Sequence, residues 1–328
     1  MLNGPMRTTI ILGTRGSELA LKQTAMVTAQ LEAAHPGILV KRKIIQTAGD
    51  KRPDLRFSEF SKGDTAILDK GIFIKELEVA LDKGEIHAAV HSLKDVPSAL
   101  EPQFSIASVL ERAPIEDVLI SAQPFTLDTL PKGARIGTSS VRRARQLQWL
   151  RPDLNIVELR GNVPTRIRKC LGDNALDAIL LATAGVLRLD LLKLATSTIE
   201  IDGQTLHAQV LDPVIFMPAA GQGAIAIEVR SDDAESRACV RALNHDMTEA
   251  RVIAEREFLR LLGAGCQTPV GAHTTLENSN LHMSVRVFSE SDLQAAPQEL
   301  QATVPVDQPL ELAKQLANKV TKSSVVGH

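Results

Sequence analysis

Arginine is concentrated in one stretch of this 328-residue chain. Residues 142–168 contain seven arginines and only two acidic residues, Asp153 and Glu158. Guanidinium groups match carboxylates and phosphates in a bidentate way, so this stretch predicts a site for a polycarboxylate or a phosphate. For any single arginine, a solvated basic helix surface is an equally good interpretation.

The arginine motifs "GTSSVRR" and "LRGNVPTR" each follow an apolar run that is typical of a buried strand. Ligands of open α/β sheets bind beyond the carboxyl ends of strands, and the first turn of the next helix offers unpaired N–H groups to anions. The motif "GTRGS" stands in the same way after the first apolar run. The residues placed at such strand ends are Thr138, Ser139, Ser140, Arg142, Arg143, Arg160, Arg166, Arg15 and Ser17.

A carboxylate stands at a further strand end, in "VHSLKDVP". Asp95 could stabilise a cationic intermediate or move a proton if it faced a cationic site. A turn aspartate before Val-Pro is the commoner interpretation of the motif by itself. His91 alternates with Leu93 and is interpreted as a buried structural histidine.

A thiol lies between glycines and a Gln-Thr-Pro turn in "LLGAGCQTPVG". Cys170 and Cys239 fall within helical patterns, where a small buried hydrophobe is expected, but Cys266 does not. A loop thiol can be a nucleophile, a redox sensor or a covalent anchor. No His or Asn motif marks a cysteine hydrolase, so the residues alone indicate attachment or reactivity and leave the choice open.

Bulk composition excludes several classes of protein. Hydrophobic residues make up 44% and charged residues 23%, which is ordinary for a soluble globular chain. The net charge of −2 and the 3% aromatic content argue against binding of nucleic acid. No apolar run is long enough to span a membrane, and the N-terminus lacks the features of a signal peptide, so we expect a cytoplasmic protein.

The elements that must position these residues alternate between strands and helices. Two successive stretches, each reading strand, helix, strand, helix, strand, predict an α/β plan with parallel pairing that is used twice. Beyond residue 246 the pattern changes to helices and half-exposed strands, which predicts a smaller α+β domain. We expect strands at 8–14, 38–47, 86–93, 134–140, 155–160, 176–185, 281–290 and 299–306, and helices at 17–35, 71–84, 140–151, 163–173, 186–195, 248–263 and 309–320.

The sequence resembles the porphobilinogen deaminase family over nearly its full length. The resemblance is carried, in the family's order, by "GTRGSELAL", "GIFIKELEVAL", "AAVHSLKDVP", "IGTSSVRRARQL", "ELRGNVPTR", "DAILLATAGVLRL", "PAAGQGAIAIE" and "GAGCQTPVGAH".

The resemblance implies two hinged α/β domains of the periplasmic-binding-protein type and a smaller α+β domain that carries the cofactor cysteine. The expected boundaries are 1–112 with 224–241, then 116–217, then 246–328. It also implies a monomeric transferase of tetrapyrrole biosynthesis that uses porphobilinogen. Four units would condense head to tail with loss of ammonia, and hydrolysis would release hydroxymethylbilane. The primer would be a dipyrromethane cofactor joined to Cys266 by a thioether.

The resemblance also implies roles for single residues. Asp95 would be catalytic, because it would contact the pyrrole nitrogens and stabilise the cation that forms as ammonia leaves. Residues implied to bind the cofactor are Cys266, Asp95, Lys94, Lys70, Thr138, Ser139, Arg142 and Arg143. Residues implied to bind substrate are Arg15, Ser17, Gln23, Ser140, Arg160, Arg166, Arg188 and Gln222.

One stretch departs from the family pattern. The segment "FSKGDTAILDKGIF" lacks the usual glycine pair, and the loop at 48–70 is long for a compact domain. Two other functions are compatible with parts of the sequence. One is a two-lobed protein that binds an anionic small molecule without chemistry, and the other is a cysteine-dependent hydrolase.

Overall fold

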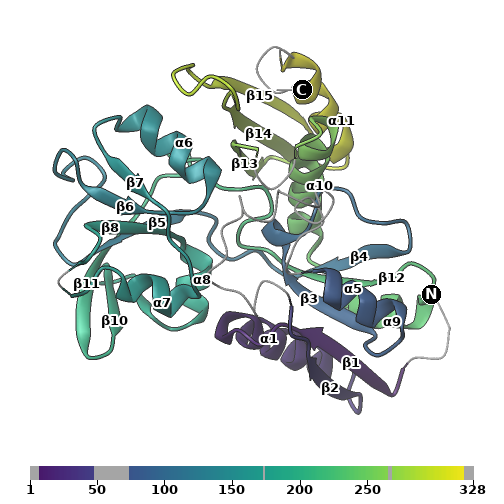
Figure 1. The fold of residues 1–328 in the computed structure, drawn as a ribbon. Coiled ribbons are helices and arrows are strands. Elements are labelled where there is room, and N and C mark those ends of the chain that lie inside the picture. The colour runs from purple at the N-terminus through teal and green to yellow at the C-terminus, as the bar shows by residue number, and fades with distance from the viewer. Residues whose placement is uncertain (1–6, 48–73, 173, 265–267, 321–328) are drawn as a thin grey trace, which may run out of the picture. The chain divides into compact units, whose positions relative to one another are not determined.

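The protein is described here by a computed structural model, which defines residues 7–47, 74–172, 174–264 and 268–320 (Figure 1). The chain forms two compact units, each assembled from two separate segments. Unit 1 contains residues 1–113 and 224–249, and unit 2 contains residues 114–223 and 250–328. The three-domain division expected from the sequence stays a prediction.

Unit 1 is built on a five-stranded sheet with the order β2-β1-β3-β12-β4. β1 is parallel to β2 and to β3, as expected, whereas β12 is antiparallel to both of its neighbours. The strands are β1 (Thr9–Thr14), β2 (Leu39–Ile44), β3 (Ala88–Ser92), β4 (Phe104–Val109) and β12 (Ile225–Arg230), and the helices are α1 (Glu18–Ala34), α5 (Lys75–Asp82) and α9 (Ala234–Arg241).

Local sequence explains the start of α1 and the burial of the central strands. Ser17 caps α1, because its Oγ accepts a hydrogen bond of 3.3 Å from the N–H of Ala20. β12 is buried on both faces, as a central strand between two layers should be. The edge strand β2 carries the charged run Lys41-Arg42-Lys43 instead, which discourages pairing with another chain.

Unit 2 repeats this topology in its seven-stranded sheet, whose order is β7-β6-β8-β5-β11-β10-β9. β6 is parallel to β7 and β8, and β5 is antiparallel to β8, just as β12 is to β3. The strands are β5 (Asp117–Ser121), β6 (Arg135–Gly137), β7 (Asn155–Val157), β8 (Ala178–Ala182), β9 (Leu192–Lys193), β10 (Thr198–Ile201) and β11 (Gln204–Val210), and the helices are α6 (Val141–Leu150), α7 (Val163–Arg168) and α8 (Thr183–Arg188).

The helix expected at 186–195 is wrong. The strand expected at 176–185 ends at Ala182, and α8 runs over Thr183–Arg188. Asp190 then has a φ of 58°, a left-handed conformation that a helix cannot continue through. The chain turns there, and Leu192 pairs with Ile199 in β9 and β10. Apolar residues at helical spacing thus belong to the end of α8, a turn and a two-residue strand in which Leu192 is buried and Lys193 is exposed.

The C-terminal part of unit 2 is a three-stranded antiparallel sheet covered by helices, which confirms the expected α+β character. Asn278 and Ser279 both have positive φ and form a two-residue hairpin loop between the first two strands. Leu281, Val285 and Leu312 are among its fully buried core residues. The elements are β13 (Val270–Glu277), β14 (Asn280–Val287), β15 (Gln298–Pro305), α10 (Asp246–Leu261) and α11 (Pro309–Lys319).

This sheet approaches the segment before residue 218 very closely at Gly271. A Cβ atom added to Gly271 would lie 2.6 Å from the Cβ of Met217, so only glycine fits there without movement. The N–H of Ala272 donates a 2.9 Å hydrogen bond to the carbonyl of Pro218. Gly271 therefore sets the spacing between β13 and residues 217–218.

We expect Gly271→Ala to lower the free energy of unfolding by about 1–3 kcal/mol, since an added methyl group overpacks a tight contact. Urea denaturation measures the effect. Ser284→Ala on the neighbouring strand is the matched control, because it changes a half-buried side chain without adding an atom to the sheet. An unchanged midpoint in Gly271→Ala would show that the approach of Met217 is not restrictive.

Candidate active site

In unit 1, Arg15, Lys94 and Asp95 follow two neighbouring parallel strands. β1 and β3 pair at Leu12–Ala88, so the residues that follow both strands lie at the same edge of the sheet. Lys94 and Asp95 belong to a short 3-10 turn after β3. Asp95 is exposed and Lys94 is half-buried.

Buried anchors hold this turn in place. Leu93 is fully buried, and its N–H donates a 3.0 Å hydrogen bond to the carbonyl of Ala224. Gln23 of α1 is also buried and exchanges hydrogen bonds of 2.9 and 3.2 Å with the hydroxyl of Ser92. The exposed carboxylate of Asp95 therefore projects from a rigid support.

In unit 2, three hydroxyl residues connect the ends of β6 and β7. The N–H of Thr138 bonds to the carbonyl of Val157 at 2.9 Å, and the Ser139 hydroxyl receives the N–H of Leu159 at 3.1 Å. Ser140 caps α6 by accepting the N–H of Arg143 at 3.4 Å. These three residues lie at the end of β6, as expected from the sequence. Their hydrogen bonds also hold the ends of β6 and β7 together.

Arg142 and Arg143 share one buried carboxylate, that of Asp117. Arg142 Nη2 lies 2.8 Å from Asp117 Oδ2, and Arg143 Nη2 lies 2.7 Å from Asp117 Oδ1. Asp117 is completely buried, and both arginine side chains are more than nine-tenths buried. Gln222 Nε2 adds a bond of 2.9 Å to Oδ1, and Arg142 also donates to the carbonyl of Met217.

Sheet topology explains this meeting. Asp117 begins β5, which runs antiparallel to β8 and pairs there with Ala182. The first residue of β5 therefore lies at the edge where β6 and β8 end, and α6 begins there. An acidic side chain at this position therefore meets Arg142 and Arg143 in the first turn of α6.

The charges at this edge do not cancel. Burial would raise the pKa of Asp117, but Arg142 and Arg143 outweigh it and hold that pKa well below its usual value. Burial lowers the pKa of Arg142, and Asp117 offsets part of this effect. Two guanidiniums with one carboxylate carry a net positive charge, which favours an added anion.

Arg188, at the end of α8, is a further cation and is half-buried. Burial lowers its pKa to about 10, and its Nη2 donates a 2.7 Å hydrogen bond to the carbonyl of Gly223. Within the described ranges, the buried Nε groups of Arg142 and Arg188 have no hydrogen-bond acceptor. Such unsatisfied donors are costly unless a ligand accepts from them, so this donor set fits carboxylate groups.

The remaining arginines of the cluster divide into two groups. Arg160 and Arg166 lie after β7, where Arg160 pairs with Glu158 at 2.6 Å and Arg166 Nε donates to the carbonyl of Gly161. Three others bind elsewhere in unit 2 and do not belong to this edge. Their partners are the carbonyls of Asp292 and Leu293 for Arg145, Asp153 for Arg151, and the exposed Asp202 for Arg168.

Two predicted site residues, Cys266 and Lys70, lie outside the described residues, as does the loop at 48–70. Cys170 and Cys239 are fully buried, as the sequence predicted. Burial raises the pKa of Cys170 to about 12, so this thiol is not a reactive thiolate at neutral pH. No cluster of His, Cys, Asp or Glu suited to a metal ion occurs in the part of the chain that the structure describes.

Sequence reasoning missed Asp117. The residue stands directly before the apolar run "VLIS", and a lone acidic residue at the start of a buried strand is the only signal that could have identified it. Its importance depends on partners that are 25 and 26 residues away along the chain.

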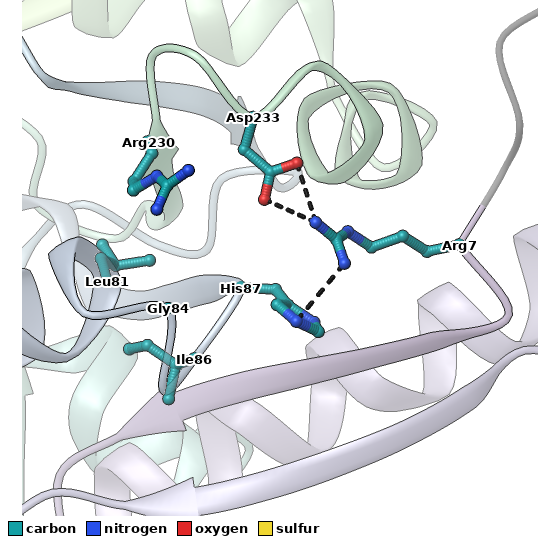
Figure 2. Close-up of a pocket in the computed structure, with 7 residues that line it drawn as sticks. All are labelled: Arg7, Leu81, Gly84, Ile86, His87, Arg230 and Asp233. Carbon is teal, nitrogen blue, oxygen red and sulfur yellow. Dashed lines mark hydrogen bonds and ion pairs between the residues drawn. The ribbon is translucent and has the colours of Figure 1, made fainter.

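A small pocket of about 150 Å³ lies at the opposite edge of the unit 1 sheet, beside the starts of β1 and β3 (Figure 2). Arg7 Nη2 donates to both oxygens of Asp233 at 2.9 and 3.1 Å, so its charge is already paired. Burial, followed by the Arg7 charge, lowers the pKa of His87. Pockets for substrates usually measure about 300–1,000 Å³, so this one is too small.

Comparison with known proteins identifies the family. A family model described as "Porphobilinogen deaminase, dipyromethane cofactor binding domain" matches residues 10–238, and the family's C-terminal domain matches residues 249–322. The chain belongs to the porphobilinogen deaminase family. Membership makes it a transferase of tetrapyrrole biosynthesis that polymerises porphobilinogen and uses a dipyrromethane cofactor. A two-lobed binding protein for an anionic molecule is not favoured.

Relatives in the porphobilinogen deaminase family match along most of the chain. The porphobilinogen deaminase of Roseiflexus sp. strain RS-1 is 45% identical over 276 residues, which cover 84% of each chain. That of Desulforamulus reducens is 39% identical over 315 residues, 96% of this chain and 95% of the relative. The methionine-binding protein MetQ has a similar fold at a TM-score of 0.41 and 15% identity, covering 74% of this chain and 92% of MetQ.

Every helix among the described residues is too short or too polar to cross a membrane.

We expect Asp117→Asn to lower the free energy of unfolding by about 3–5 kcal/mol, because it leaves two buried guanidiniums without their carboxylate. Urea denaturation of the purified variant measures the loss. Asp202→Asn is the matched control: its pair with Arg168 is half-exposed on both sides, and its removal should leave the midpoint unchanged. Equal midpoints for the two variants would contradict a dominant role for Asp117.

Proposed function

We propose that this chain condenses four porphobilinogen molecules head to tail onto a dipyrromethane joined to Cys266 by a thioether, and then releases hydroxymethylbilane by hydrolysis. The observation that carries the residue assignment is the uncompensated positive charge around Asp117. Every pyrrole unit of the growing chain brings two carboxylates. A site that lengthens this chain therefore needs guanidiniums that are buried, oriented and not fully neutralised.

The residues present fit the cofactor. When bound, dipyrromethane supplies the pyrrole carbon from which chain growth begins. The unsatisfied Nε groups of Arg142 and Arg188 would each donate to a carboxylate oxygen, and the excess charge beside Asp117 would stabilise that carboxylate. Arg143 would hold a further carboxylate while remaining paired with Asp117. The other residues proposed to bind cofactor or substrate are Arg15, Ser17, Gln23, Lys70, Lys94, Thr138, Ser139, Ser140, Arg160, Arg166 and Gln222.

Asp95 is proposed as the catalytic residue. When the C–N bond of the aminomethyl group breaks, nitrogen leaves as ammonia and positive charge develops on the pyrrole that remains. An ionised carboxylate that is held in place before the reaction lowers the energy of that cation without reorganising. The exposed side chain of Asp95, on a turn anchored by the fully buried Leu93, has the required accessibility and rigidity.

We further propose the domain organisation, the oligomeric state and the cellular location that are expected from the sequence. Residues 1–112 with 224–241, 116–217, and 246–328 would be three domains. The protein would act as a monomer in the cytoplasm and would bind neither nucleic acid nor membranes. Size-exclusion chromatography with light scattering tests the monomer, and a dimer mass would contradict it.

We expect Cys266→Ser to lose the covalently held cofactor. Intact-mass measurement under denaturing conditions should find the native chain heavier than its sequence by two linked pyrroles, and the variant at its bare sequence mass. Cys170→Ala and Cys239→Ala are the matched controls and should keep the adduct, because both thiols are buried. An adduct that persists in Cys266→Ser would place the attachment on another residue.

We expect Asp95→Ala to reduce turnover of porphobilinogen by at least about a hundredfold, the usual cost of removing a group that stabilises transition-state charge. Circular dichroism should show an unchanged fold, since the side chain is exposed. Asp82→Ala, which removes another exposed aspartate of unit 1, should keep full activity. Full turnover by Asp95→Ala would reject the assigned role.

A further inference from the structure

One face of α6 binds the C-terminal part of unit 2. Arg142, Gln146 and Trp149 lie three or four residues apart and therefore share a helix face. Arg145 stands next to this face and donates to the carbonyls of Leu293 and Asp292 at 2.8 and 2.9 Å. The helix that carries Arg142 and Arg143 is thus held by residues almost 150 positions further along the chain.

Gln146 links α6 to Met217. Its Oε1 accepts the N–H of Met217 at 2.7 Å, and its Nε2 donates to the carbonyl of Met217 at 3.0 Å. The same carbonyl accepts a hydrogen bond from Arg142 Nη1. Gln146 is completely buried, so its amide orients both the Met217 peptide groups and the guanidinium of Arg142.

Arg286 of β14 completes this connection. Its Nη1 donates to Gln146 Oε1 at 3.2 Å and to the carbonyl of Ile215 at 2.7 Å. Its guanidinium lies 4.6 Å from the centroid of the Trp149 ring, and only 5% of its side chain is exposed. Two further partners are the carbonyl of Val214, which accepts from Nη2 at 3.3 Å, and the half-exposed Glu299, which accepts from Nε at 2.7 Å.

Aromatic rings extend the contact along α6. Trp149 and Phe288 meet edge to face with their centroids 6.2 Å apart, and Arg145 lies 5.5 Å from the centroid of Phe288. Two arginines and two rings therefore lock the far end of the helix against β14 and the residues after it. A shift of α6 would break several of these contacts together.

The strand register connects this contact to the cofactor cysteine in sequence. Arg286 is the cross-strand partner of Gly271, which lies five residues after Cys266. Gly271 is also the residue that allows the close approach of Met217. Arg286 thus joins the strand that follows the cysteine to the helix that carries the arginines.

We propose that Arg286 is a positioning residue, which acts through Gln146 and Met217 to fix Arg142 relative to β13. Because only 5% of its side chain is exposed, it would act through these residues and not by contact with substrate or cofactor. This inference rests on the proposed function, in which Arg142 binds a carboxylate group of the pyrrole chain. Its guanidinium fork can reach Gln146, Ile215 and Trp149 together, which a lysine ammonium cannot.

A double-mutant cycle on the holoenzyme tests the proposal. Arg286→Met, Arg142→Lys and the double variant are compared by kcat/KM for porphobilinogen. Glu299→Gln is the matched control, because it removes only the negative charge of this outer partner of Arg286 and leaves the inner contacts. We expect Arg286→Met to lower kcat/KM about tenfold in the native background and hardly at all in Arg142→Lys, since residues in one network are not additive. Arg286→Lys should recover only part of the loss.

A second readout is independent of activity. Trp149 is the only tryptophan of the chain and no tyrosine is present, so fluorescence reports on this contact alone. Arg286→Met should shift the emission of Trp149, whereas Glu299→Gln should not. If Arg286→Met does not fold, Arg286→Lys takes its place in both measurements with the same criteria.

The outcomes separate the two proposals. If Arg142→Lys lowers kcat/KM but Arg286→Met has no effect, or has an equal effect in both backgrounds, the positioning role is overturned and the role of Arg142 stands. If Arg142→Lys is fully active, the proposed role of Arg142 fails and the positioning role falls with it. Unchanged Trp149 emission in Arg286→Met would show that Arg286 does not contact Trp149, and the inference depends on that contact.

Discussion

The carboxylate of Asp117 stabilises two guanidiniums that are almost completely removed from water, and the rest of the arginine edge depends on this interaction. Burying a charge without a partner costs several kcal/mol, so neither arginine could stay in place without it. Because one carboxylate cannot neutralise two guanidiniums, positive charge is left over. The arrangement that lets both arginines be buried therefore also favours the binding of further anionic groups. The carboxylates of a pyrrole chain would be such groups.

Sheet topology brings these groups together. In each unit an antiparallel strand is inserted beside the third parallel strand, β12 in unit 1 and β5 in unit 2. In unit 2 the inserted strand delivers Asp117 to the edge where the parallel strands end. In unit 1 the inserted strand is preceded by Ala224, whose carbonyl anchors the turn of Lys94 and Asp95. The repeated topology supports both edges in comparable ways, although the chemistry differs.

Much of this could be predicted from the sequence because it depends on local pattern. The end of a buried strand followed by a capped helix located Ser140, Arg142 and Arg143 correctly in the fold. Counting arginines found the right region, but it could not separate Arg142 from Arg145, which is three positions away and binds the C-terminal part of unit 2 instead. That difference depends on the direction of each side chain around the helix and on what packs there.

Long-range contacts account for what the sequence did not reveal. Asp117 has significance only through strand pairing with β8 and through the first turn of α6, and Arg286 only through Gln146 and Trp149. Gly271 is required by the approach of Met217, which lies 54 residues earlier in the sequence. The helix expected at 186–195 failed because a left-handed Asp190 overrides a helical spacing of apolar residues.

The most direct measurement is a crystal structure of the protein purified with its cofactor bound. We expect carboxylate oxygens of the dipyrromethane within about 3.2 Å of Arg142 Nε or Arg188 Nε, the range of a normal hydrogen bond, while Asp117 keeps both of its ion pairs. Cofactor carboxylates bound by other residues, with Arg142 and Arg188 bonded only to Asp117 and backbone carbonyls, would contradict the assignment of this edge as the carboxylate site.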